Sequence, residues 1–563
     1  MRAIEPTSEQ ILIRDTARLD VLIIAPAGCG KTEALALRVA GLIRRGDVVP
    51  PRRSLILTFS NRARDNIRSR VFDYVPAAVA RERVTICNFH GFSARLFRAH
   101  ANVIDLAPNL ILPESDWVSE QCRTKQLNFR QTATVHQLLR EAKQEPRDDA
   151  EVEEILVDTG NKVAIEIELT RRAESRLTYD DLPRLAELIL AHDEVAELYS
   201  SHFRAVIVDE FQDLTLQQLR IVNRIGEKRT TFAGDLAQGI YGFAGASPVQ
   251  VLAAIQAEGP EEHRFAKSHR SSPAVLAVVN ALSARTGGSV LESAEPESWP
   301  HGGLACCGAF SSTESEATWI VGFARYVLGR APNHRIGIIA RTAPRRRFID
   351  AAFASADIPC HRWDDGVLDT ETAKIMSEML ARLDISSWHD AEDPFEFLRL
   401  AAGIDGVQDP STREALVDAI GWCNDLLRDG VSPLEVRSRI RIGDDKTLLN
   451  ASGVHLLTGH VGKGQQFDWV VVSGAEDGCI PDFRATTPDQ LAEEARVFAV
   501  MISRARHGVA ILRSQQVEAA SGSIYGKQPS RFLRDLSDAD VCLSLAEGVE
   551  WLKGADWQPI ANR

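Results

Sequence analysis

The fold is decided by the stretch Val21-Leu22-Ile23-Ile24-Ala25-Pro26-Ala27-Gly28-Cys29-Gly30-Lys31-Thr32, which leads into an amphipathic segment at residues 33–43. A short apolar run, a glycine-rich turn and an amphipathic segment, in this order, predict a strand, a phosphate-binding loop and a helix. Glycines let backbone N–H groups converge on phosphate oxygens, and the N-terminus of a helix attracts negative charge. We therefore expect a nucleotide site here, with an ordinary glycine-rich turn as the alternative.

Two side chains at the end of this loop have the chemistry that a nucleoside triphosphate requires. Lys31 is expected to reach the β- and γ-phosphates, and the Thr32 hydroxyl is expected to ligate Mg²⁺. The loop backbone is expected to surround the phosphates, and it comprises Ala25, Ala27, Gly28, Cys29 and Gly30. The cofactors predicted from this motif are ATP and Mg²⁺.

A second motif, Val206-Ile207-Val208-Asp209-Glu210, is an apolar run that ends in two carboxylates. Asp209 is expected to hold Mg²⁺, and Glu210 to orient or deprotonate an attacking water. A helix cap at the end of a strand is the alternative for an isolated Asp-Glu pair. Together with the phosphate loop, the pair favours a hydrolytic nucleotide site.

The alternation of apolar runs and amphipathic segments continues along the chain. The runs lie at residues 54–59, 84–87, 205–209 and 230–234, and again at 336–340, 454–458, 469–473 and 508–513. This pattern predicts an α/β fold with two parallel-sheet cores that carry mostly helical insertions. We place the first core at residues 1–88 and 201–270 and its insertion at 89–200. The second core is placed at 271–365 and 450–540, its insertion at 366–449, and a tail at 541–563.

Composition bounds the class of protein. The 563 residues are 44% hydrophobic and 25% charged, which is typical of a globular chain with several domains. No run approaches the ~18 apolar residues of a membrane-spanning helix, and no signal peptide is evident, so a cytoplasmic location without a membrane partner is expected. Nine scattered cysteines form no CxxC pair, which argues against zinc and iron–sulfur sites.

The formal net charge of −13, taken alone, argues mildly against a nucleic-acid partner, but net charge does not describe a single groove. Basic residues do cluster locally. One cluster comprises Arg62, Arg64, Arg68 and Arg70, and the other comprises Arg341, Arg345, Arg346 and Arg347. Each cluster is interpreted either as a set of DNA contacts or as a solvated helix face.

The run Asp209-Glu210-Phe211-Gln212-Asp213 resembles motif II of the UvrD/Rep-type superfamily 1A DNA helicases. Other stretches resemble further family motifs in the same order, from about residue 6 to 536. They are 6–10 (Q motif), 57–63 (motif Ia), 88–91, 178–182, 234–241 (motif III), 268–271 (motif IV), 339–342, 458–464 (motif V), 500–506 (motif VI) and 529–533. The resemblance implies two RecA-like cores with the nucleotide between them.

For the nucleotide, the resemblance implies that Gln10 reads the adenine edge and that Gln466 faces the ribose. His269 stands where the family usually has a tyrosine on the adenine. The catalytic residues implied around the γ-phosphate are Lys31, Glu210, Gln238, Arg270 and Arg504. Arginines at this place stabilise the charge that develops during phosphoryl transfer.

For DNA, the resemblance implies single-strand contacts from Phe59, Asn61, Arg62, His90, Tyr241, Phe243, Arg341 and His460. Stacking of bases on aromatic rings tolerates any sequence, and a place in the core is the alternative for each ring. The implied activity is an ATP-dependent translocase or helicase, 3′-to-5′, on single-stranded DNA and duplex junctions. DNA repair, recombination and phage defence are the implied settings, with a nuclease or repair protein as a partner.

The sequence departs from the family at three further places. Motif III continues Phe243-Ala244-Gly245-Ala246 instead of Trp-Arg-Gly-Ala, and Gln466 replaces a glutamate of motif V. The second insertion is about half the usual length, and no nuclease signature follows residue 540. These departures keep open a nucleotide-gated DNA sensor that acts with a partner nuclease in a defence complex. A motor subunit of a Gabija-type anti-phage system, in which a partner nuclease cuts the DNA, is another alternative. An RNA motor is a further alternative.

Overall fold

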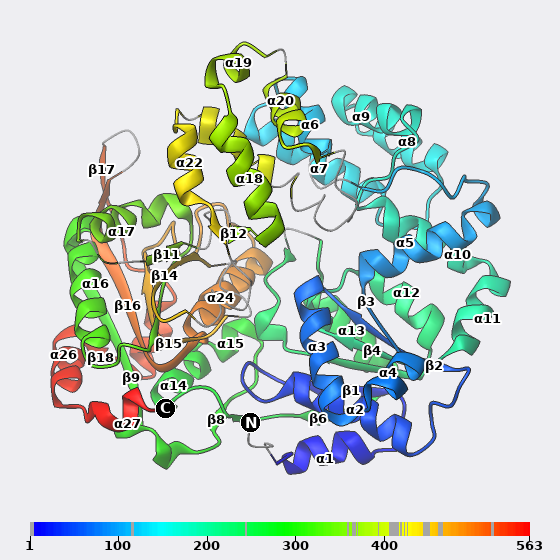
Figure 1. Cartoon of the computed structure of the whole chain (residues 1–563). Helices are drawn as coiled ribbons and strands as arrows, with labels where there is room; N and C mark the ends of the chain where they lie inside the picture. The colour runs from blue at the N-terminus through cyan, green and yellow to red at the C-terminus, as the bar shows by residue number, and fades with distance from the viewer. Residues whose placement is uncertain are drawn as a thin grey trace. The chain divides into compact units, whose positions relative to one another are not determined.

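The chain forms two compact units, residues 1–268 and 269–563, in a computed structural model (Figure 1). The structure describes residues 5–563 except 114–116, 243–244, 357, 359, 363–366, 369, 392, 405–415, 417–418, 422, 425, 429, 443–450, 460–464 and 519–522. The first unit ends at Ser268, so His269 and Arg270 belong to the second unit. Among the described residues, no helix has the length and apolarity needed to cross a bilayer.

The first unit is built on a six-stranded sheet in the order β3-β2-β4-β5-β1-β6, and all neighbouring strands are parallel. The strands are β1 (Val21–Ile24), β2 (Arg53–Thr58), β3 (Val84–Asn88), β4 (Phe203–Asp209), β5 (Thr230–Gly234) and β6 (Glu261–Arg264). The first five coincide with predicted apolar runs, whose side chains are buried on the strands. The predicted α/β class is confirmed.

Helices cover this sheet. They are α1 (Ser8–Asp15), α2 (Lys31–Arg44), α3 (Asn61–Tyr74), α4 (Ala77–Arg83), α5 (Phe89–His100), α10 (Asp181–Ala191), α11 (Asp193–His202), α12 (Leu216–Gly226) and α13 (Pro248–Ala257). Residues of α5 and α10, such as Phe97 and Leu185, share one hydrophobic core with the sheet residues Leu57 and Val208. The two ends of the predicted insertion therefore pack as part of the sheet's own core.

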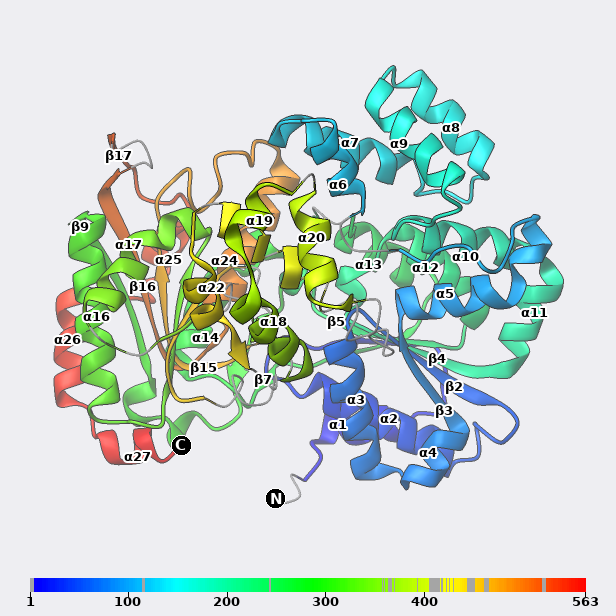
Figure 2. The same ribbon diagram turned by 45° about the horizontal axis from the view of Figure 1, so that its top comes forward.

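The middle of the insertion has a separate core. It consists of α6 (Trp117–Thr124), α7 (Phe129–Ala142), α8 (Asp149–Asp158) and α9 (Lys162–Ala173), which Figure 2 shows as a group apart from the sheet. A buried ion-pair cluster joins it to α10, since Lys143 Nζ lies 2.8 Å from Glu168 and 3.0 Å from Asp181. Burial would raise the pKa of Asp181, but Lys143, Arg171 and Arg184 hold that pKa well below its usual range. Asp181 therefore has a structural role.

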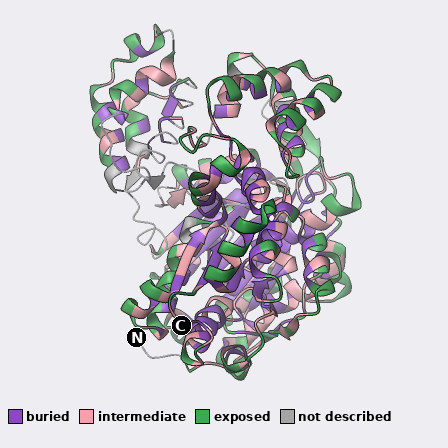
Figure 3. Ribbon diagram, turned by 90° about the vertical axis from the view of Figure 1, so that its right-hand side faces the viewer, coloured by how far each residue is buried: buried purple, intermediate pink, exposed green. Residues whose placement is uncertain are grey.

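The second unit holds a larger sheet in the order β11-β14-β10-β15-β16-β9-β18, with β17 antiparallel to β16. Its strands are β9 (Leu304–Ser312), β10 (Arg335–Ala340), β11 (Cys360–Arg362), β14 (Gly453–Thr458), β15 (Phe467–Ser473), β16 (Ala505–Glu518), β17 (Ile524–Gly526) and β18 (Leu543–Ser544). The four runs predicted in this half all lie on strands. In Figure 3 the buried residues gather on strands and on the helix faces that cover them.

The helices around this sheet are α14 (Pro273–Ala281), α15 (Ser283–Thr286), α16 (Thr313–Leu328), α17 (Ala343–Ser355), α24 (Pro488–Ile502), α25 (Leu533–Asp538), α26 (Leu545–Gly554) and α27 (Trp557–Ala561). The segment after residue 540, expected as a tail, supplies β18, α26 and α27 to this unit. Leu552 and Ile560 from it are buried in the same core as Val471 and Leu512.

The second insertion has its own helical core. Its described elements are β12 (Val367–Leu368), α18 (Thr370–Arg382), α19 (Ile385–His389), α20 (Pro394–Ala401), α22 (Pro433–Arg439) and β13 (Arg441–Ile442). Met376, Trp388, Leu398 and Val436 are buried together in that core. This packing agrees with a short helical domain in the predicted place.

Candidate nucleotide and DNA sites

Five candidate segments of the first unit follow the carboxyl ends of parallel strands. The phosphate loop follows β1, Phe59 follows β2, His90 follows β3, Glu210 follows β4 and Asp235 follows β5. In a parallel sheet these ends lie along one edge, where ligands of open α/β sheets bind. The sheet thus brings together the first-unit residues that the sequence assigns to nucleotide and DNA.

The phosphate loop has the backbone that an anion site needs. Gly28 and Gly30 adopt φ values of 84° and 81°, in the left-handed region that favours glycine. Helix α2 begins at Lys31, and its N-cap, Gly30, offers no side chain to the first-turn N–H groups. These uncapped donors and the helix dipole fit a phosphate group. Thr32 lies in the same first turn.

Gln10 packs against this loop. Its Nε2 donates to the Gly30 carbonyl over 3.2 Å, while its Oε1 accepts from the Thr7 backbone N–H over 3.0 Å. A Cβ atom on residue 30 would lie 2.5 Å from Gln10 Nε2, so glycine is needed there for the contact as well as for φ. The predicted adenine reader is thus held at the phosphate loop by the capping box of α1.

Lys31 lies between the two carboxylates of motif II. Its ammonium is 3.1 Å from Asp209 Oδ1 and also forms an ion pair with Glu210. Burial lowers the pKa of Lys31, but the two carboxylates outweigh it and the pKa lies above its usual value. To reach a phosphate, the charged lysine must exchange these carboxylates for phosphate oxygens.

The same cluster fits Mg²⁺. Among the described residues, neither Lys31 Nζ nor Asp209 Oδ1 has an aligned hydrogen bond, although both atoms are buried. Carboxylate and hydroxyl oxygens are the ligands that Mg²⁺ prefers, and Asp209 and Thr32 supply one of each. A phosphate-bound Mg²⁺ would neutralise charge on the β- and γ-phosphates.

Glu210 has a strained backbone. Its φ of 61° and ψ of 54° place it in the left-handed region, which a side chain with a Cβ seldom occupies. Such strain persists where the surrounding structure enforces it, and it concentrates at functional positions. The strain turns the chain sharply after β4, and the side chain faces Lys31.

Motif III forms a tight loop after β5. Asp235 caps the short helix η3 (Leu236–Gln238), because its Oδ1 accepts from the Ala237 N–H over 3.1 Å. Gln238 Nε2 donates to the other oxygen, Asp235 Oδ2, over 2.9 Å. The predicted γ-phosphate sensor is therefore fastened to the end of β5.

The DNA candidates of this unit include a stacked aromatic pair. The rings of Phe59 and Tyr241 lie 5.1 Å apart with an interplanar angle of 15°. Burial, with Asp213 and Glu210 nearby, raises the pKa of Tyr241 to about 12, so its hydroxyl stays neutral. The two rings predicted to stack on bases thus stack on each other and are only partly buried, and their contact with DNA stays a prediction.

A cavity of about 260 Å³ adjoins this pair, and Phe59, His90, Arg140, Tyr179 and Asp213 are among the residues that line it. His90 packs edge-on against Tyr179 at 5.4 Å, and burial lowers the pKa of His90 below its usual value. A contact of His90 with DNA would therefore come from a neutral ring. Asn61 and Arg62 begin α3, but their side chains, like Phe243, are outside the described residues.

In the second unit, the predicted nucleotide residues lie at the amino-terminal edge of the sheet. Gln466 precedes β15 and Arg504 precedes β16. The segment of His269 and Arg270 is tied to the same place, since Ser271 Oγ donates to the Ala505 carbonyl over 2.7 Å. Arg504 is buried, and its Nε and Nη2 donate to the Val500 carbonyl and Ser503 Oγ at 2.9 and 3.0 Å. Its γ-phosphate contact stays a prediction.

One predicted DNA residue of this unit, Arg341, belongs to the opposite edge of its sheet. Arg341 follows β10, and its guanidinium forms a bidentate ion pair with Glu494, with Nη2–Oε1 at 2.6 Å. His460, two residues beyond the end of β14, lies outside the described residues. The described nucleotide candidates Gln466 and Arg504 and the DNA candidate Arg341 thus lie at opposite edges of one sheet.

The basic cluster around Arg345 has an unexpected role. Arg345 is buried, forms ion pairs with Glu316 and Glu476, and lies 2.8 Å from Glu476 Oε1. Burial lowers its pKa, but the two glutamates outweigh it and raise the pKa above its usual value. The expectation of a DNA contact or a solvated face is wrong for Arg345. Its partners are distant in sequence, so the local pattern held no signal of them.

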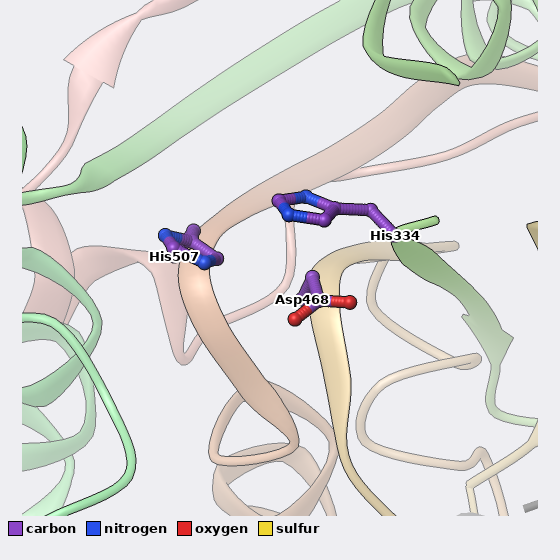
Figure 4. Close-up of side chains that lie close together, drawn as sticks. All are labelled: His334, Asp468 and His507. Atoms are coloured by element: carbon purple, nitrogen blue, oxygen red, sulfur yellow. The ribbon is translucent and has the colours of Figure 1, made fainter. Parts of the chain in front are cut away.

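A further polar cluster in this unit comprises His334, Asp468 and His507, which face one another in Figure 4. Trp469 Nε1 donates to His334 Nδ1 over 3.1 Å, and Asp468 accepts from the Arg335 N–H and from Arg506 at 2.8 and 3.0 Å. A cation would have to displace these partners. The cluster therefore supports the packing of the C-terminal segment, which Arg506 also reaches through the Arg563 carbonyl.

Comparison with known proteins agrees with this arrangement. The model of the UvrD/REP helicase N-terminal domain matches residues 7–257, and that of the UvrD-like helicase C-terminal domain matches residues 434–516. The ATP-dependent DNA helicase UvrD2 of Mycobacterium tuberculosis is 26% identical over 92% of this chain and 79% of its own length. The ATP-dependent DNA helicase Rep of Buchnera aphidicola is 22% identical over 92% of this chain and 93% of its own length.

The ATP-dependent DNA helicase PcrA of Leuconostoc citreum is 28% identical over 46% of this chain, and the alignment spans 37% of that protein. The two domain models together match more than half of the chain, in the order in which the motifs occur. The chain therefore belongs to the UvrD/Rep-type superfamily 1A helicases.

Proposed function

We propose that this protein is an ATP-hydrolysing motor that translocates along single-stranded DNA and separates duplex junctions. One observation carries the proposal. The hydrolytic cluster of Lys31, Asp209 and Glu210 and the stacked pair of Phe59 and Tyr241 follow strands of one parallel sheet. A change at one place can therefore reach the other within a single rigid core.

The hydrolytic step uses residues of this cluster in separate roles. Lys31 binds the β- and γ-phosphates. Glu210 accepts a proton from the attacking water while the water oxygen bonds to the γ-phosphorus and the bond between the γ-phosphorus and the β-phosphate oxygen breaks. Asp209 and Thr32 hold Mg²⁺. Gln238 contacts the γ-phosphate, and Arg270 and Arg504 of the second unit offset the charge that develops there. Gln10, His269 and Gln466 hold the nucleoside.

On the DNA side, bases stack on the rings of Phe59, Tyr241 and Phe243, while Asn61, Arg62, His90, Arg341 and His460 contact the strand. Stacking contributes ~1–3 kcal/mol per base and permits movement along any sequence. The family implies 3′-to-5′ movement and a place in DNA repair, recombination or phage defence. A repair protein or a nuclease is the expected partner.

A second candidate is a nucleotide-gated DNA sensor in a defence complex with a partner nuclease. The departures Ala244 and Gln466 favour it, because each removes a charged group of the family pattern. The intact pair of Lys31 and Glu210 favours turnover instead.

Steady-state ATP hydrolysis, measured with and without single-stranded DNA, tests the motor. We expect strong stimulation by DNA and a loss of about 10²–10⁴-fold in Glu210→Gln, the range of general-base catalysis. Single-stranded RNA serves as the matched control polymer. Binding of ATP and DNA without turnover that depends on Glu210 would overturn the motor and leave the sensor.

A further inference from the structure

A buried amide lies beside the proposed catalytic carboxylate. Gln212, on the short helix η2 (Phe211–Asp213), is fully buried, and its Nε2 donates to Glu210 Oε2 over 2.5 Å. Its Oε1 accepts from the Asp235 backbone N–H over 2.9 Å. A carboxylate can only accept and a backbone N–H can only donate, so both neighbours fix the orientation of this amide.

The hydrogen bonds continue from Asp235 into motif III. Asp235 Oδ2 accepts from Gln238 Nε2 over 2.9 Å, so one unbroken chain of hydrogen bonds joins Glu210, Gln212, Asp235 and Gln238. Beyond Gln238 the same loop passes through the buried Ile240 to Tyr241, whose ring stacks on Phe59. The ring proposed to contact DNA and the Asp235 N–H that holds Gln212 are therefore carried by one short loop.

A glycine at the end of β5 leaves room for this amide. A Cβ atom on Gly234, the last residue of β5, would lie 2.2 Å from Gln212 Oε1 and 2.6 Å from Phe211 Cδ1. Gly234 thus admits the side chain of Gln212 to the end of β5. A buried amide that loses one partner is destabilised by the full free energy of desolvation. The bonds of Gln212 to Glu210 and to the Asp235 N–H are therefore expected to form and break together as the motif III loop moves.

This chain lacks the motif III arginine that most family members carry, since Ala244 stands in its place. We propose that Gln212 is a positioning residue that couples DNA contact at Tyr241 to the orientation of the Glu210 carboxylate. A base that stacks at Tyr241 shifts the loop and the Asp235 N–H. Gln212 follows that N–H, and its own N–H turns the carboxylate toward the attacking water. The inference rests on the proposed function.

The coupling is tested with Gln212→Met, which keeps the length of the side chain and removes both hydrogen bonds. kcat and KM for ATP are measured at zero and at saturating single-stranded DNA, and the DNA Kd is measured by fluorescence anisotropy. We expect the stimulation by DNA to fall about tenfold or more, as for loss of a hydrogen bond to a charged group. KM and Kd are expected within about twofold of wild type, because Gln212 touches neither ligand, and basal kcat is expected to fall less than stimulated kcat.

Gln212→Glu is the second variant, since it has nearly the same shape and keeps an acceptor for the Asp235 N–H while it loses the donor to Glu210. It is expected to lose stimulation as well. The control is Asn280→Leu, which removes a side-chain amide that makes two 2.8 Å hydrogen bonds to Leu291 in the second unit. Stimulation is expected to persist in this control.

The outcomes separate the two claims. A wild-type protein without DNA stimulation refutes the proposed function. A stimulated wild type together with stimulated Gln212→Met and Gln212→Glu variants refutes the coupling role alone. An equal fall of basal and stimulated kcat in both variants also refutes it, because Gln212 would then support hydrolysis itself.

Discussion

Lys31 of the first unit and Arg345 of the second are buried cations that each contact two carboxylates, but the hydrogen bonds of the two clusters are completed in different ways. In the first unit Lys31 lies between Asp209 and Glu210, and in the second Arg345 lies between Glu316 and Glu476. All four oxygens of the two glutamates accept hydrogen bonds, with Ser473 and Ser514 among the donors. Asp209 Oδ1 and Lys31 Nζ have no aligned hydrogen bond within the described chain.

Charge composition alone does not distinguish a binding site from a structural ion pair. Buried polar groups are nearly always hydrogen-bonded, so groups that lack such bonds point to a ligand. The strained backbone of Glu210 adds to this difference, since neither Glu316 nor Glu476 has a positive φ. Within the described part of the chain Arg345 Nη1 also has no hydrogen bond, whereas the carboxylates of Glu316 and Glu476 have them. A buried carboxylate oxygen without a hydrogen bond is therefore a better indicator of a ligand site here than a cation nitrogen without one.

The largest effect is expected for Arg345→Met. It leaves Glu316 and Glu476 buried without a cation, which costs about 3–5 kcal/mol of unfolding free energy. Urea unfolding followed by tryptophan fluorescence measures this, because eight of the nine tryptophans lie beyond residue 268. Arg347→Met, which removes a half-buried arginine bonded to the Glu518 carbonyl, is the control. A loss of unfolding free energy below about 1 kcal/mol would contradict the structural role of Arg345.

Lys31→Met is the matched change in the first unit. We expect kcat to fall about 10²–10³-fold, as for loss of an electrostatic stabiliser of the transition state. The loss of stability should be smaller than for Arg345→Met, because the Glu210 side chain is 25% exposed and solvent can reach it. ATP hydrolysis and urea unfolding followed by circular dichroism measure the two effects, with the exposed Lys162→Met as control. Equal destabilisation by Lys31→Met and Arg345→Met would contradict the distinction between a ligand site at Lys31 and a structural ion-pair cluster at Arg345.

Stacked rings extend the comparison. Phe59 and Tyr241 are only partly buried, whereas the stacked rings of Trp469 and His507, 5.8 Å apart, are buried in the second core. Tyr241→Ala is expected to weaken single-stranded DNA binding by ~1–3 kcal/mol, or about 5- to 150-fold in Kd, with little change in stability. Tyr241→Phe, which retains the ring, should bind like wild type. If anisotropy titrations give Tyr241→Ala the same DNA Kd as wild type, the pair of Phe59 and Tyr241 has a packing role only.

Acid is expected to act on the second unit first. Burial lowers the pKa of His455 and of His507 from 6.5 to about 3, so both rings are neutral in the folded chain. The stability that these depressed values contribute is present above pH 6.5 and is lost as the pH falls toward 3. By contrast, the raised pKa of Lys31 affects stability only at alkaline pH.

At pH 5 the loss is about 2 kcal/mol for each of these histidines relative to neutral pH. Urea titrations at pH 7 and pH 5, read by tryptophan fluorescence, measure it. His507→Gln, which removes one buried titrating ring, should lose less stability between the two pH values than wild type. Identical pH dependence of the two proteins would show that His507 does not titrate as its burial requires.

The smallest effect is expected for Gln466→Glu. Gln466 is exposed, so the change should not disturb the fold. A carboxylate accepts a hydrogen bond from a ribose hydroxyl about 1 kcal/mol more strongly than an amide does, which lowers KM for ATP about fivefold. The nucleotide without its 2′- and 3′-hydroxyls tests the contact, because its KM should not change. An equal gain with that nucleotide would assign the effect to overall charge.

Local patterns predicted most of the fold, because the strands are short apolar runs and the phosphate loop has a fixed order of residue types. The strand β9 was missed, since its run Leu-Ala-Cys-Cys-Gly-Ala-Phe-Ser-Ser is poor in branched aliphatic residues. At the site, the sequence indicated Lys31, Asp209 and Glu210, whose roles follow from residue type and position. The contact of Gln212 with Asp235 and the ion pairs of Arg345 could not be predicted, because they join residues that only the folded chain brings together.

The pairing of β1 has a consequence for biosynthesis. This strand carries the phosphate loop, yet its partners are β5 and β6, which end at Gly234 and Arg264. At ~5–20 residues per second, the roughly 240 residues from β1 to β6 take on the order of 10–50 s to translate. During that interval the nascent loop has no sheet to hold it. ATP can therefore assist folding of the first unit only after nearly half of the polypeptide has left the ribosome.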